Sequence, residues 1–309
     1  MENFDLEKDE TPQADAVLEL SAASAVSACL YVVATPIGNL GDVSPRMRDT
    51  LAMVDVVAAE DTRVTAQLLS LLGLKKPLVP SHGHNEKASA QTLIEKLQAG
   101  QNIALVSDAG TPAVSDPGAW VVKAVAAAGF PVVPVPGPSA VLAAVAGSGL
   151  VEGPFYFSGF LPSKGGARSK ALAAVLERSE SVVLFEAPHR IETLFEEMLA
   201  LGTHLRECCV ARELTKKFET FYRGSMESVA ALLAADGNGR RGEFVIVLGP
   251  KPQDTLTPLM ASVNPFELLD ALLEHLPNKT AVKLVVQTTG APRNALYDHA
   301  LKKGDDAAQ

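Results

Sequence analysis

The sequence contains few cysteines and few aromatic residues. Cys29, Cys208 and Cys209 are its three cysteines in 309 residues, and they lack the even number and the spacing of a disulfide framework. No CxxC pair marks a zinc site either, so we expect no structural metal. Unpaired thiols are typical of a reducing compartment, and we therefore predict that the protein is cytoplasmic.

Long apolar runs are also missing. Lys123 and clusters of glycine and proline interrupt the apolar stretches before any reaches the ~20 residues that a membrane-spanning helix needs. The N-terminus is acidic, whereas a secretory signal begins with basic residues. We therefore expect no membrane partner. Hydrophobic residues still make up 47% of the chain, which is enough for a sizeable globular core.

Basic residues are not in excess. The formal net charge is −9, and residues 1–28 supply most of it because they hold seven acidic residues and one lysine. This composition predicts a disordered acidic tail over residues 1–28. The remaining weakly acidic balance argues only mildly against a nucleic-acid partner.

Several widespread catalytic motifs are absent. The chain has no GxxxxGKS/T phosphate-binding loop, no HExxH zinc motif and no GxSxG nucleophile elbow. The corresponding nucleotide-hydrolysing, zinc-protease and serine-hydrolase classes therefore lose support. The chain has instead a series of Gly- and Pro-rich loops, each directly after a short β-branched apolar run.

Apolar runs that read as strands alternate with helical segments through most of the chain, which predicts an α/β fold. We expect two α/β domains, over residues 29–150 and 151–250, with a mostly parallel sheet in the first and mixed strand directions in the second. Residues 251–264 are predicted to be a linker. Residues 265–309 are predicted to form a small C-terminal helical appendage of the helix-turn-helix kind.

The loops after the predicted strands carry the most specific strings. They read ATPIGNLGD (34–42), AEDTR (59–63), VSDAGTPAVSDPG (106–118), PGPSA (136–140), FEAPHR (185–190), ARELTKKFE (211–219) and GEFVIVLG (242–249). In this order and spacing, over about residues 29–301, they resemble the tetrapyrrole-methylase superfamily. Within it, the chain resembles the branch that methylates the ribose 2′-oxygen of a decoding-centre cytidine in 16S rRNA.

This resemblance implies S-adenosyl-L-methionine as methyl donor, bound between the two α/β domains, and a homodimer. The donor-binding residues that it implies are Pro36, Ile37, Gly38, Asp108, Ala109, Gly110, Ala113, Ser139, Ala140, Ala211, Glu213 and Phe244. Small residues such as Gly38 and Gly110 let the backbone approach a ligand closely. Ser139 and Ala140 begin a predicted helix whose free N–H groups can meet a polar ligand. Asp108 accepts hydrogen bonds from the donor or, alternatively, caps its own loop.

The acceptor chemistry points to AEDTR. A ribose hydroxyl must be aligned or deprotonated before it attacks a methyl group, so a positioned carboxylate is useful. We predict that Glu60 or Asp61 orients or deprotonates the hydroxyl and that Arg63 holds a phosphate. The alternative is an Asp–Arg pair that merely caps the following helix. His82 and His84 are further candidate bases, and Glu186, His189 and Arg190 are candidates for lining an RNA channel.

Basic side chains form a scattered candidate surface for RNA phosphates. They are Lys164, Arg168 and Lys170 in one loop region, Lys216, Lys217 and Arg223 in another, and Lys279, Lys283, Arg293, Lys302 and Lys303 in the appendage. A solvated face would look the same, and the resemblance is what favours RNA. The alternative functions are a corrin-type tetrapyrrole methylase and a non-catalytic rRNA-binding assembly factor. The corrin-methylating relatives carry a GxGxGD-type first loop, whereas this chain has Pro36-Ile37-Gly38-Asn39 there.

Overall fold

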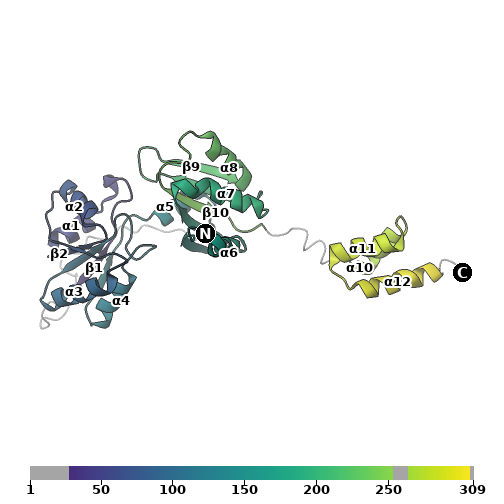
Figure 1. Ribbon diagram of the computed structural model, residues 1–309, viewed down its shortest axis with the longest axis horizontal. Helices are drawn as coiled ribbons and strands as arrows, with labels where there is room; N and C mark the ends of the chain where they lie inside the picture. Colours follow the sequence, from purple (N-terminus) through teal and green to yellow (C-terminus); the bar gives the residue numbers. More distant parts are fainter. Residues whose placement is uncertain (1–27, 253–263, 307–309) are drawn as a thin grey trace, which may run out of the picture. The chain divides into compact units, whose positions relative to one another are not determined.

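The computed structural model describes residues 28–252 and 264–306, and the chain divides into two compact units after Lys251 (Figure 1). The predicted acidic tail and most of the predicted linker lie outside the described residues. The first unit contains two five-stranded sheets, and the second contains helices only. The predicted α/β class is thus confirmed.

The first sheet is entirely parallel, with strand order β3-β2-β4-β1-β5. Its strands are β1 (Leu30–Val33), β2 (Val56–Ala59), β3 (Leu78–Pro80), β4 (Ile103–Val106) and β5 (Val132–Val135). The chain leaves β1 toward one edge and later crosses to β5 on the other side. That reversal creates the kind of switch point at which open α/β sheets bind ligands, outside the carboxyl ends of the strands.

Helices cover both faces of this sheet. They are η1 (Leu40–Asp42), α1 (Pro45–Met53), α2 (Thr62–Leu71), α3 (Glu86–Gln98) and α4 (Ala119–Ala127). The central strand β4 is apolar at every position because it is buried on both sides. Ile103 and Leu105 pack with α3 and α4, whereas Ala104 and Val106 pack with α1 and α2.

The second sheet has mixed strand directions and the order β6-β7-β10-β8-β9. Its strands are β6 (Phe155–Phe160), β7 (Ser181–Glu186), β8 (Glu207–Arg212), β9 (Thr220–Ser225) and β10 (Phe244–Leu248). Only β6 and β7 run parallel. Residues 213–219 turn the chain back, so β9 pairs antiparallel to β8.

The helices of the second half are α5 (Ala140–Ser148), α6 (Gly165–Leu176), η2 (Pro188–Arg190), α7 (Ile191–Ala200) and α8 (Met226–Ala235). One face of the second sheet packs on α6, α7 and α8, and the other face packs on α5. The predicted domain boundary after residue 150 assigns α5 to the first domain. Its buried residues Val141 and Ala144 instead pack with Val183, Ala211 and Val247 of the second sheet.

The described part of the C-terminal unit contains α10 (Pro265–Leu273), α11 (Asn278–Thr289) and α12 (Arg293–Asp306), so the predicted C-terminal helices are present. Leu269, Ala281, Val285 and Leu296 form a small core of its own. Gly290 ends α11 in a left-handed conformation, as a helix C-terminus favours. Within the described residues, no helix is long and apolar enough to cross a bilayer.

Candidate active site

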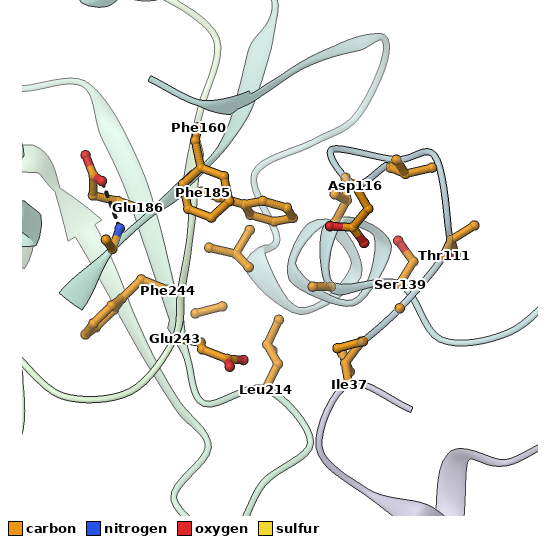
Figure 2. A pocket seen from close by; sticks show the side chains of 18 of the residues that line it. Ile37, Thr111, Asp116, Ser139, Phe160, Phe185, Glu186, Leu214, Glu243 and Phe244 are labelled. Atoms are coloured by element: carbon orange, nitrogen blue, oxygen red, sulfur yellow. Dashed lines mark hydrogen bonds between the residues drawn. The ribbon is translucent and has the colours of Figure 1, made fainter. Parts of the chain in front are cut away.

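A cavity of about 390 Å³ lies between the carboxyl edge of the first sheet and the second sheet (Figure 2). This volume falls in the range typical of small-molecule sites. Its walls are mostly apolar and backbone, with a few carboxylates. The lining residues are Ile37, Ala109, Gly110, Thr111, Val114, Asp116, Ser139, Ala140, Val141, Phe160, Phe185, Glu186, Ala187, Pro188, Ala211, Leu214, Glu243, Phe244 and Val245.

The loops after β1, β4 and β5 build one wall. Thr35 and Gly110 exchange two backbone hydrogen bonds, of 2.8 and 3.0 Å, which tie the first loop to the second. Thr111 Oγ1 donates to the Pro138 carbonyl at 3.2 Å and thereby ties the second loop to the third. Gly110 has φ +81°, and a Cβ there would lie 3.4 Å from Ile37. That contact is an ordinary one, so it is the left-handed backbone conformation that favours glycine at this position.

Strands of the second sheet and their ends build the opposite wall. Phe185 packs edge-on against Phe157 and tilted against Phe160, with ring centroids 5.1 and 5.4 Å apart. In Figure 2, Phe160, Phe185 and Phe244 lie on the side of the cavity that faces Thr111 and Ser139. Flat apolar rings opposite backbone amides are suited to a ligand with both an aromatic part and polar groups.

Uncommon backbone conformations gather beside the cavity. Four non-glycine residues in the described ranges have positive φ: Ala113, Ser115, Glu213 and Thr215. The first two belong to the loop after β4 and the other two to the loop after β8, and both loops contribute to the lining. Such conformations cost free energy and cluster at functional sites. This clustering supports the cavity as the working site of the molecule.

Carboxylates gather at the ends of β2 and β4. Burial raises the pKa of Glu60, the backbone N–H of Asp108 opposes that shift, and Asp108, Asp116 and Asp61 add to it. Burial also raises the pKa of Asp116, which lines the cavity, and the nearby Asp108 adds to the effect. A carboxyl group whose pKa is raised toward neutrality is a better general base. Glu60 and Asp116 therefore have the electrostatics of a proton acceptor.

Asp61 caps α2. Its Oδ1 accepts from the Arg63 backbone N–H at 2.8 Å, and its Oδ2 lies 2.6 Å from the Arg63 guanidinium. Hydrogen bonds from Arg63 lower the pKa of Asp61 to about 2. The structure thus contains the cap that was the alternative interpretation of this motif. Asp61 is a poor candidate base as a result, whereas the Arg63 side chain is 89% exposed and its outer face is open to a ligand.

The predicted donor-binding residues divide into two groups. Those that line the cavity are Ile37, Ala109, Gly110, Ser139, Ala140, Ala211 and Phe244, and those outside its lining are Pro36, Gly38, Asp108, Ala113 and Glu213. Glu60, Asp61 and Arg63 do not line it either. The Asp108 carboxylate is engaged outside this lining, because its Oδ1 accepts a hydrogen bond from the Asp61 N–H at 2.9 Å.

Several lining residues were not predicted individually. Asp116 is inside the VSDAGTPAVSDPG string, but the left-handed turns at Ala113 and Ser115 that place it could not be inferred. Phe160 is the last residue of β6, and Glu243 directly precedes β10 within the GEFVIVLG string. Phe185 could have been found from the sequence, because it begins the FEAPHR string at the end of β7.

Two of the predicted RNA-channel residues, Glu186 and Arg190, belong to an ion-pair cluster with Arg168. Glu186 Oε2 lies 3.0 Å from Arg168 Nη1, and its Oε1 lies 2.6 Å from Arg190. Arg168 also contacts Glu197 through Nε at 2.9 Å. The Arg168 side chain is only 4% exposed, so its interpretation as part of an exposed basic face is wrong. Glu186 is fully buried between two guanidinium groups, which makes it unsuitable as a free base.

Other candidates are also constrained. Lys216 bridges Glu213 and Glu243 at 3.0 and 3.1 Å, so its charge is compensated. The rings of His82 and His84 form a T-shaped pair with centroids 6.1 Å apart, and neither residue lines the cavity. Lys164, Lys170, His189 and Lys217 remain exposed. The side chains of Lys302 and Lys303 lie outside the described residues.

The cavity fits an adenosyl amino acid better than a metal ion. Apolar and aromatic residues face one part of it, and the N-terminus of α5, with Ser139 as N-cap, faces another. Helix N-terminal amides hold carboxylates and other polar groups. Across the described ranges, no three His, Cys, Asp or Glu side chains are grouped so that they could hold a metal.

Comparison with known proteins agrees with this geometry. The model of the Tetrapyrrole (Corrin/Porphyrin) Methylases matches residues 29–230, and that of the RsmI C-terminal HTH domain matches residues 267–304. The chain therefore belongs to the tetrapyrrole methylases, as its loop strings predicted.

Curated relatives narrow the assignment. Ribosomal RNA small subunit methyltransferase I of Xylella fastidiosa is 46% identical over 87% of this chain and 97% of its own length. The protein of the same name in Escherichia coli O157:H7 is 42% identical over 89% of this chain and 95% of its own length. The chain is thus a member of the ribosomal RNA small subunit methyltransferase I family.

Solved structures show the same fold at lower identity. Uroporphyrin-III C-methyl transferase from Thermus thermophilus, complexed with S-adenyl homocysteine, matches with a TM-score of 0.51 and 21% identity, covering 71% of this chain and 96% of that chain. Diphthine synthase matches with a TM-score of 0.55 and 16% identity, covering 72% and 90%.

Proposed function

We propose that the protein transfers a methyl group from S-adenosyl-L-methionine to the ribose 2′-oxygen of a decoding-centre (P-site) cytidine in 16S rRNA. The observation that carries this proposal is the match along nearly the whole length of relatives named ribosomal RNA small subunit methyltransferase I. The match includes both the cavity-bearing unit and the C-terminal helices.

The donor is held in the cavity between the two sheets. Ala211, Phe244 and Val245 offer an apolar wall and strand backbone for the adenine. Ala109 and the Ser139–Ala140 start of α5 offer amides for the amino-acid part, and Gly110 lets the backbone approach it. When bound, S-adenosyl-L-methionine supplies a methyl group on a positively charged sulfur, which is an electrophile that needs no metal.

The residues that follow β2 act on the RNA, which is the methyl acceptor. The partly buried Glu60 carboxylate, with its raised pKa, accepts the proton of the ribose hydroxyl. Asp61 fixes the first turn of α2 and the Arg63 backbone. The exposed Arg63 guanidinium binds an RNA phosphate on the side away from Asp61. Loss of the Arg63 side chain should then raise the RNA concentration at half-saturation and leave donor affinity unchanged.

The partner is 16S rRNA within the small ribosomal subunit, in the cytoplasm, and the active form is a homodimer. Exposed Lys279, Lys283 and Arg293 of the C-terminal unit contact phosphates outside the catalytic cavity. The main unit supplies the chemistry, and the C-terminal unit supplies additional RNA affinity.

Two measurements on the purified chain test this function. Calorimetric titration with S-adenosyl-L-methionine should give saturable binding in the presence of a metal chelator, and absence of binding would favour a non-catalytic assembly factor. Labelled methyl groups should then pass to small ribosomal subunits and not to uroporphyrinogen III. Labelling of the tetrapyrrole instead would favour the corrin-type alternative.

A further inference from the structure

A second cavity, of about 280 Å³, lies at the N-terminus of α6, outside the donor pocket. Its lining includes Ser163, Lys164, Gly165, Arg168, Arg190 and Glu197. Three of these side chains are cationic and one is a carboxylate. Glu197 is already paired with Arg168 Nε at 2.9 Å, so the cavity keeps an excess of positive charge.

Arg168 has one nitrogen left over. Nε contacts Glu197, and Nη1 contacts Glu186 and the Pro162 carbonyl. Nη2 is buried and has no hydrogen-bond partner among the described residues. A buried guanidinium donor without an acceptor costs free energy, so this nitrogen favours a water or an anion that can accept from it. Arg168 lines the cavity, and Nη2 is its one nitrogen without an acceptor among the described residues.

The start of α6 adds backbone donors. Lys164 is the N-cap of this twelve-residue helix, and its side chain makes no capping hydrogen bond. Gly165 has φ +75°, and a Cβ on Gly165 or Gly166 would meet open space. Free amides at a helix N-terminus bind anions, and phosphate above all.

The position of this cavity links it to the reaction. Glu186 lines the donor pocket, and its two carboxylate oxygens are held by Arg168 and Arg190, which both line the second cavity. Phe160 lines the donor pocket, and the chain that follows it leads through Ser163 into α6. One buried ion-pair cluster therefore lies at the border of both cavities.

We propose that this cavity binds a backbone phosphate of the RNA substrate and so positions the strand that carries the reactive ribose. The phosphate oxygens accept from Arg168 Nη2, from the first amides of α6 and from the Lys164 ammonium. This inference rests on the proposed function, since RNA supplies the phosphate. The sequence predicts a scattered basic surface for RNA phosphates, whereas this cavity would be one discrete phosphate site.

The anion site itself is tested with inorganic phosphate on the full chain, without RNA. In amide NMR spectra, phosphate should shift the Gly165 and Gly166 resonances in a saturable way. The shift should persist in Lys75→Ala, which removes an exposed lysine of the first sheet's half, weaken in Lys164→Ala and disappear in Arg168→Lys. Arg168→Lys keeps a cation for Glu186, and an unchanged melting temperature would show that it folds. Absence of any shift at Gly165 and Gly166 in the wild-type chain would overturn the proposal.

Binding measurements with RNA test whether the phosphate in this cavity belongs to the RNA backbone. For Lys164→Ala, we expect several-fold weaker binding to small ribosomal subunit RNA and a salt-dependence slope lower by about one unit. Lys75→Ala should match the wild type, and donor affinity should be equal in Lys164→Ala, Lys75→Ala and the wild type. If phosphate binds at Gly165 but Lys164→Ala and Lys75→Ala bind RNA equally, the RNA assignment of this cavity is wrong. Failure of the proposed function would look different, because the wild type itself would then methylate no RNA.

Discussion

The Asp108 carboxylate accepts a hydrogen bond from the Asp61 backbone N–H, with Oδ1 2.9 Å from the nitrogen. In return, the Asp108 N–H donates to Glu60 Oε2 at 3.4 Å. These bonds join the loop after β2 to the loop after β4, which supplies Ala109 and Gly110 to the donor pocket. The candidate base is thereby fixed relative to one wall of that pocket.

Glu60→Gln should reduce the single-turnover rate at saturating rRNA by about 10²–10⁴-fold, the usual contribution of a general base. Donor affinity should stay within about twofold, because Glu60 does not line the donor pocket. The deficit should shrink as the pH rises, since hydroxide takes over the proton transfer. Rapid-quench measurements across pH give this profile. A variant with near-normal rates would move the base to Asp116 or leave catalysis to alignment alone.

Ser139→Trp should abolish measurable donor binding, because an indole at the start of α5 fills the polar end of the cavity. Ser139→Ala is the matched control. It loses the cap on the Leu142 N–H, which costs about 1 kcal/mol of stability, but it leaves the space open. Calorimetry with S-adenosyl-L-methionine should separate the two variants clearly. Equal affinities would place the donor elsewhere.

Asp116→Asn should raise the melting temperature of the donor-free chain at neutral pH by a few degrees. The folded-state pKa of Asp116 lies above its ordinary value of 3.8, so its ionisation opposes folding. Its favourable contribution is complete below pH 3.8 and is lost as the pH rises through the raised folded-state pKa. The gain over the wild type should therefore vanish in acid. A gain that stays constant with pH would contradict this electrostatic account.

Charge reversal at Lys279 and Lys283 should weaken RNA binding and lower its salt-dependence slope by about one unit for each lost phosphate contact. Both side chains are exposed on α11, so the core around Val285 should remain intact. Fluorescence titrations at several salt concentrations measure the slope, and circular dichroism checks the fold. With an unaltered slope, these lysines would belong to an ordinary solvated face.

Most of the fold follows from local patterns. Val56–Ala59 and Ile103–Val106 are apolar at every position and are followed by turn residues, so parallel strands buried on both faces could be expected. The antiparallel return at β9 could not, because it depends on left-handed residues at Glu213 and Thr215 that sequence does not favour.

The site was predictable where its groups belong to backbone loops with glycine or a helix cap, as at Gly110 and Ser139. It was not predictable where distant side chains decide the outcome. Arg168 looks like a surface cation in sequence, yet Glu186 and Glu197 lie 18 and 29 positions further along the chain and hold it in the interior. Long-range ion pairing of this kind leaves no local pattern.

The most direct test of the account is the product of the reaction. Small ribosomal subunits that lack the modification would be incubated with the purified chain and methyl-labelled S-adenosyl-L-methionine, and the 16S rRNA would be mapped by mass spectrometry. The account predicts one labelled nucleotide, a decoding-centre cytidine with the methyl group on its ribose 2′-oxygen. A label on a base, on another nucleotide or on no RNA at all would contradict it.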